Sequence, residues 1–163
     1  MQILNHQFSI EVAGEYDLNF REHPEAFRFQ HGEQGVFKVE PYKSEILPNW
    51  QYKDEPAAEE SSAAIWEQFI DYRAAEDFVG MDMARKYLQM GFTRAMRYAK
   101  YPGGRKYDDD GHENEPQTWA DEEKREAAAV FKSTLDAAKD DDTYQRLRER
   151  HKREVYDPDA SPM

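Results

Sequence analysis

The sequence predicts an α+β protein that is mainly α: a bundle of about four helices with an N-terminal strand and loop region packed over it. Two observations lead to this fold class. Near Ala58 the spacing of apolar residues changes from the period of about two that strands show to the helical period of about 3.6. Before that point, glycines and prolines interrupt the chain at short intervals, as they do in turns and loops.

Length and composition set the domain organisation. The chain has 163 residues, of which 13% are aromatic. This length is that of one domain, and aromatic side chains bury enough area to form a core. We therefore expect residues 1–156 to form a single domain, with the strand and loop region at 1–56 and the helical region at 57–156. Residues 157–163 are expected to be a disordered tail.

The N-terminal region carries two strand signals and a stiff loop. Runs of alternating polarity at residues 8–12 and 36–39 predict two half-buried strands, with a turn at 31–35 before the second. Residues 40–50 (EPYKSEILPNW) form a loop that two prolines stiffen. Two interpretations of this loop stay open. It is either a strap that packs over the helices, or a support that offers Tyr42, Lys43 and Glu45 to a ligand.

Four later segments carry the helical pattern. The first covers about residues 58–75, and the second, of about 20 residues, follows a break at 77–80 and ends before Pro102. The third begins near Thr118, a suitable N-cap, with carboxylates at 121–123 in the first turn. The fourth covers about residues 143–155 and has Tyr144, Leu147 and His151 on one side.

The composition excludes several classes of protein. Without cysteine the chain has no disulfide, no thiolate nucleophile and no cysteine-ligated metal. The N-terminus does not resemble a secretory signal and no apolar stretch is long enough to span a membrane, so we expect a cytoplasmic protein with no membrane partner. The formal net charge of −12 favours a salt-rich host and argues against broad affinity for nucleic acid.

One segment has a positive net charge, opposite to that of the whole chain. Residues 81–107 contain seven basic residues and one acidic residue, so they form a basic island in an acidic chain. On a helical wheel, four of these cations share one arc with Met83 and Met90. We expect this arc, continued by a glycine turn, to be exposed and to hold a phosphate-bearing ligand, because arginine grips phosphate through two donors and glycine lets backbone amides approach. The candidate residues are Lys86, Arg94, Arg97, Lys100, Arg105, Lys106 and Tyr107.

Signals for catalysis or metal binding are weak. The chain has no P-loop, no G-x-G-x-x-G and no G-x-S-x-G motif, and the acidic residues 108–113 do not match a calcium loop. His31 and Glu33 could form an acid/base pair in their glycine turn. We therefore predict no metal and no cofactor and name no catalytic residue.

Four strings carry a resemblance: GEQGV at residues 32–36, EPYKSEILP at 40–48, DFVGMDMARKYLQM at 77–90 and GGRKY at 103–107. Through them the chain resembles a family of small cytoplasmic proteins from bacteria, archaea, phages and some eukaryotes that is catalogued as a domain of unknown function. The resemblance extends over about residues 15–152. It implies no activity, but it implies that the matching surfaces belong to one recurrent site.

Three functional hypotheses remain. In the first, the basic helix face and the GGRKY turn bind a phosphate-rich ligand, either nucleic acid or a nucleotide. In the second, the same face docks a protein partner or a second copy of the chain. In the third, loop carboxylates serve an enzyme whose reaction the sequence does not identify. A purely structural interpretation of the basic residues also stays open, in which they pair with carboxylates of the first and third helices.

Overall fold

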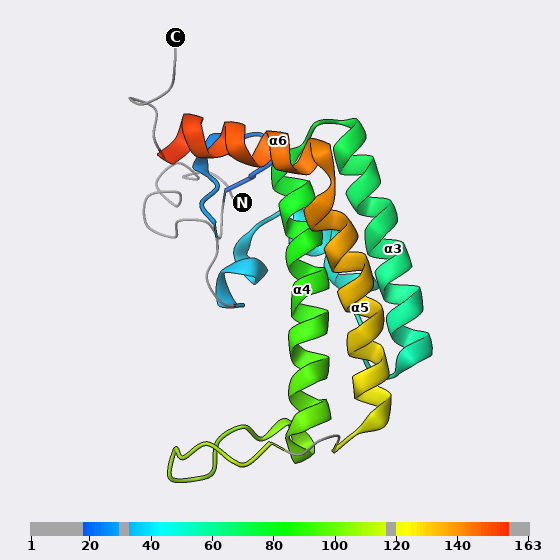
Figure 1. Cartoon of the computed structure of the whole chain (residues 1–163). Helices are drawn as coiled ribbons and strands as arrows, with labels where there is room; N and C mark the ends of the chain where they lie inside the picture. The colour runs from blue at the N-terminus through cyan, green and yellow to red at the C-terminus, as the bar shows by residue number, and fades with distance from the viewer. Residues whose placement is uncertain (1–17, 30–32, 117–119, 157–163) are drawn as a thin grey trace.

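A computed structural model describes residues 18–29, 33–116 and 120–156 (Figure 1). Its main body is helical, as the sequence predicts. Helices α3 (Glu55–Ala74), α4 (Phe78–Lys100) and α5 (Glu122–Asp140) lie side by side, and α6 (Asp142–His151) crosses them at one end (Figure 1). A short helix, α2 (Tyr42–Ile46), and several single helical turns complete the described part of the chain.

Aspartates begin the four longer helices. Each accepts a hydrogen bond from the backbone N–H three residues further on, which satisfies one of the donors that a helix N-terminus leaves unpaired. The caps are Asp54 for α3, Asp77 for α4, Asp121 for α5 and Asp141 for α6. The prediction that Thr118 caps the third helix is therefore wrong, because that helix begins at Glu122 behind Asp121; Thr118 itself lies outside the described residues.

The core lies between α3, α4 and α5. Ile65 and Phe69 of α3, Leu88 of α4 and Phe131 of α5 are fully buried, and burial of each such side chain stabilises the fold by about 1.5–3 kcal/mol. Helix α4 approaches α5 closely at Gly91, where a Cβ atom would lie 2.7 Å from the Phe131 ring. Glycine at this position therefore lets the two helices pack in contact.

The N-terminal region differs from the prediction. Residues 36–39 were expected to be a strand, but Gln34–Lys38 form a 3-10 helix, η3. A 3-10 turn brings residues three apart to one side, and this buries both Val36 and Val39. Among the described residues there is no β-strand, and the only ladder contacts are isolated bridges, one of them between Asn19 and Glu40. The predicted strand at 8–12 and the predicted tail at 157–163 lie outside the described residues.

Candidate functional site

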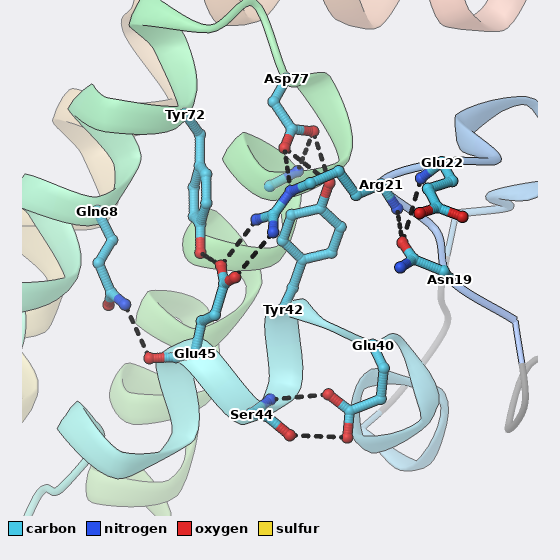
Figure 2. A network of polar contacts seen from close by, with 11 residues as sticks. Asn19, Arg21, Glu22, Glu40, Tyr42, Ser44, Glu45, Gln68, Tyr72 and Asp77 are labelled. Atoms are coloured by element: carbon cyan, nitrogen blue, oxygen red, sulfur yellow. Dashed lines mark hydrogen bonds and ion pairs between the residues drawn. The ribbon is translucent and has the colours of Figure 1, made fainter. Parts of the chain in front are cut away.

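Figure 2 shows a polar network that joins the N-terminal segment to α2 and to the turn between α3 and α4. Arg21 lies at its centre. Its Nη1 and Nη2 donate to the two carboxylate oxygens of Glu45 at 2.9 and 2.8 Å, and its Nε lies 3.6 Å from Asp77. The guanidinium carbon also lies 4.8 Å from the centroid of the Tyr42 ring. These contacts fix both the position and the orientation of the guanidinium.

Two tyrosines complete the network. The hydroxyl of the fully buried Tyr42 donates to Asp77 at 2.7 Å, and the hydroxyl of Tyr72 donates to Glu45 at 2.7 Å. Burial, assisted by these carboxylates, raises the pKa of both tyrosines, so both hydroxyls remain protonated donors. The hydrogen bond from Arg21 lowers the pKa of Glu45, which is therefore ionised at neutral pH.

The sequence predicts a loop at 40–50, but this segment forms α2 and a 3-10 turn at Leu47–Asn49. Its predicted ligand-binding residues take part in the network. Tyr42 and Glu45 use their polar atoms within the protein, and Nζ of Lys43 lies 3.9 Å from Glu40. Glu40 in turn accepts hydrogen bonds from the backbone N–H and the hydroxyl of Ser44 (Figure 2). Both carboxylates of this segment are thus hydrogen-bonded internally, which favours the interpretation of it as a packing strap.

The four predicted cations of α4 lie in two environments. Lys86 and Arg94 are partly buried, whereas Arg97 and Lys100 are exposed. Arg94 donates from Nε and Nη2 to Glu33 at 2.8 and 2.6 Å, and these hydrogen bonds raise its pKa. Burial lowers the pKa of Lys86. The N-terminal segment therefore covers part of the surface that we expected to be exposed.

The helical wheel also misplaced two methionines. Met83 and Met90 are 1% and 2% exposed, so they belong to the core and not to a ligand-binding arc. Another cation of the basic island is internal as well. Arg85 pairs with the buried Asp82 at 2.8 Å, and the same carboxylate accepts from the Tyr144 hydroxyl at 2.6 Å. The carboxylate that pairs with Arg85 therefore lies on α4 itself, whereas we expected such carboxylates on the neighbouring helices.

Arg97 faces a hollow beside the C-terminal half of α4, with a volume of about 380 Å³. Its Nε donates to the carbonyl oxygen of Gly104 at 2.7 Å, and within the described ranges the side chain pairs with no carboxylate. Its charge is therefore not neutralised, whereas Glu33 neutralises that of Arg94. We call this space the α4 C-terminal hollow; its lining is Glu33, Tyr52, Thr93, Arg94, Arg97, Tyr98 and Gly104.

Two tyrosines that line this hollow, and a lysine beside them, were not suggested by the sequence. Tyr52, just before α3, and Tyr98 of α4 both line it. Nζ of Lys124, on α5, lies 6.0 and 5.6 Å from the centroids of these two rings, and it donates to the carbonyl oxygen of Lys53 at 2.6 Å. No sequence spacing connects these positions, because only the packing of the helices brings them together.

The backbone N–H groups of the turn after α4 are not available to bind phosphate. The N–H groups of Gly104, Arg105 and Lys106 all donate to carbonyls within the turn. Gly104 has a φ of 72°, and a Cβ atom there would lie 2.8 Å from the Tyr98 ring, so glycine is needed for the close approach of the turn. The other predicted residues, which are Lys86, Lys100, Arg105, Lys106 and Tyr107, do not line the hollow.

One further cluster offers metal-ligand atoms. Ligand atoms of Asp108, Asp110 and His112 lie within 4.8 Å of one another, and all three residues are exposed. Asp108 already accepts hydrogen bonds from the backbone N–H groups of Asp110 and His112. These contacts stabilise a turn, and we assign no metal to it.

The described residues thus form a mainly helical protein with a polar network around Arg21 and a hollow beside Arg97. The family model described as "Domain of unknown function (DUF4385)" matches residues 11–154, and the chain belongs to this family. This match confirms the resemblance seen in the sequence. No curated protein and no solved structure matches the chain. Of the helices in the described residues, none has the length and apolar character needed to cross a membrane.

Proposed function

We propose that the protein binds a small phosphate-bearing ligand, of about nucleotide size, in the α4 C-terminal hollow. The observation that carries the proposal is the state of Arg97, which lines the hollow, is oriented by the Gly104 carbonyl and has no carboxylate partner in the described part of the chain. Only Nε is used in that contact, so the terminal Nη groups remain as donors. Arginine binds phosphate through such parallel N–H groups.

The surroundings of Arg97 favour a nucleotide-sized ligand. Small-molecule pockets have volumes of about 300–1,000 Å³, and the volume of this hollow, about 380 Å³, lies within that range. Tyr52 and Tyr98 offer aromatic surfaces on which a base could stack, and Lys124 adds a positive charge beside both rings. Because Glu33 neutralises Arg94, we assign the phosphate contact to Arg97; Lys124 does not line the hollow and contributes only its nearby charge.

The proposal is tested by titrating the full chain with ATP and with inorganic phosphate in a calorimeter. Arg97→Gln should weaken ATP binding about tenfold, because it removes a charge-assisted contact, while the melting temperature stays within a few degrees. Arg146→Gln is the matched control, since Arg146 is an exposed arginine on α6 that does not line the hollow. Equal ATP affinities of the wild type and Arg97→Gln would contradict the proposal.

A second probe separates the alternatives. A labelled single-stranded oligonucleotide that binds more tightly than ATP, with a steep salt dependence, would indicate nucleic acid as the ligand. Absence of binding by ATP, phosphate and the oligonucleotide at millimolar concentration would defeat the proposal. Arg97 and Lys100 would then be left with a role in helix stability, because they lie in the last turn of α4, where cations suit the helix dipole.

A further inference from the structure

A second hollow, with a volume of about 580 Å³, lies at the opposite end of α4. Three segments form it: residues between 21 and 25, the turn between α3 and α4 at 75–79, and residues 147–155. Figure 1 shows α6 crossing the bundle at this end. We call this space the α4 N-terminal hollow. Its volume is suitable for a small organic molecule.

His151 lines this hollow, and only one of its two ring nitrogens has a hydrogen-bond partner in the described part of the chain. The residue is 8% exposed, lines the hollow, and has its Nε2 2.8 Å from the carbonyl oxygen of Phe27. Because a carbonyl oxygen only accepts hydrogen bonds, Nε2 carries the proton and Nδ1 presents a lone pair. No described residue donates to Nδ1. A molecule in the hollow therefore meets a hydrogen-bond acceptor at this ring.

The charges around the hollow favour a cation. Two basic residues line it, Arg21 and Arg150, and Arg21 already pairs with Glu45 outside the lining. Four acidic residues also line it: Glu25, Glu76, Asp77 and Glu154. Asp77 lies 3.6 Å from Arg21 and Glu76 lies 3.8 Å from Arg146, which leaves Glu25, beside His23, and Glu154 to set against the charge of Arg150. The rest of the wall is largely apolar, with Phe78 and Leu147 among its members. No group of three metal-ligating side chains occurs here within the described residues, so a metal ion is a poorer fit than an organic cation.

We propose that the α4 N-terminal hollow binds a small organic amine, whose N–H donates to Nδ1 of His151 and whose apolar body packs against Phe78 and Leu147. The carboxylates around the hollow offset the positive charge of the amine. Burial lowers the pKa of His151, so its ring is neutral at pH 7 and does not repel the cation. This inference does not depend on the function proposed above, because it uses different residues at the other end of α4.

The test uses the full chain and phenethylamine as the probe, with affinity measured by calorimetry. Glu154→Gln should weaken binding about threefold and Arg150→Gln should strengthen it about threefold, as expected for single exposed charges near a bound cation. Both side chains are exposed, so neither change should unfold the protein. Glu149→Gln is the control, because Glu149 is exposed on α6, as Arg150 is, and does not line the hollow.

Nitrogen-15 NMR of labelled histidine gives the direct readout. Saturation with phenethylamine should shift the Nδ1 resonance of His151, and 2-phenylethanol, which lacks the charge, should bind more weakly than the amine. The proposal is overturned if phenethylamine does not bind at millimolar concentration or leaves the His151 resonance unchanged. It is also overturned if 3-phenylpropionate binds as tightly as the amine, or if Glu154→Gln and Arg150→Gln change affinity in the same direction.

Discussion

Glu76 has a φ of 53°, a left-handed conformation that side chains disfavour. It follows α3, and the N–H groups of Glu76 and Asp77 donate to the carbonyls of Arg73 and Tyr72. Glycine is the usual residue at this position of a helix C-terminus. Glu76→Gly should therefore raise the free energy of unfolding by about 1 kcal/mol, measured by urea denaturation. Glu76→Ala is the control, since it keeps the strained Cβ atom; equal stabilities of the two variants would contradict the strain argument.

His151 makes stability depend on pH in a defined window. Burial lowers its pKa in the folded protein from the ordinary value of 6.5, so the unfolded chain takes up the proton first as pH falls. The free energy of unfolding should be constant above about pH 7.5 and should decrease as pH falls through 6.5 toward the lowered pKa. Glu45, whose pKa is also lowered, adds a loss of stability only below pH 4.5.

Urea denaturation of the wild type and His151→Gln at a series of pH values measures this effect. The glutamine amide keeps an N–H donor for the carbonyl of Phe27 but does not titrate. The decrease near pH 6 should therefore be absent in the variant. If the free energy of unfolding decreases equally in both proteins, a titratable group other than His151 causes the pH dependence.

At the scale of elements, the Arg21 network attaches α2 to the N-terminus of α4. Tyr42→Phe removes a buried hydroxyl that donates to Asp77, the cap of α4, and should lower the free energy of unfolding by about 2 kcal/mol. Tyr72→Phe removes the equivalent bond to the more exposed Glu45 and should lower it by about 1 kcal/mol. Urea denaturation of both variants compares the two effects, and the reverse order would contradict this account.

Helices α3 to α6 could be predicted because their own residues carry a long periodic pattern, as Ile65, Phe69 and Tyr72 do in α3. Helix α2 and η3 have five residues each, and helices so short form through tertiary burial and not through propensity. For the same reason the pattern at Val36 and Val39 was mistaken for a strand. The conformation of such short segments depends on how they pack against the rest of the protein.

The candidate site could be predicted in part. Arg94, Arg97 and Gly104 line the hollow and belong to the basic island and glycine turn that the sequence predicts, because a local excess of basic residues is visible along the chain. It did not reveal that Glu33, 61 positions earlier, pairs with Arg94, or that Lys124 comes to lie beside Tyr98. A helical wheel describes one helix alone and gives no information on the segments that cover it.

At the scale of the whole molecule, the net charge of −12 makes stability depend on salt. Carboxylates repel one another across the surface, and salt screens this repulsion, since the Debye length falls from about 10 Å at 0.1 M to about 3 Å at 1 M. The melting temperature should therefore rise between low salt and molar sodium chloride. A constant or falling melting temperature would show that the acidic surface is already compensated by internal ion pairs.

A crystal of the full chain soaked with pyrophosphate tests the proposed role of Arg97, which is to hold a phosphate group in the α4 C-terminal hollow. We expect phosphate density in the hollow, with oxygen atoms about 3 Å from the Nη atoms of Arg97, and no such density in crystals of Arg97→Gln. Density that persists in the Arg97→Gln crystals, or an unoccupied hollow at saturating pyrophosphate, would contradict it.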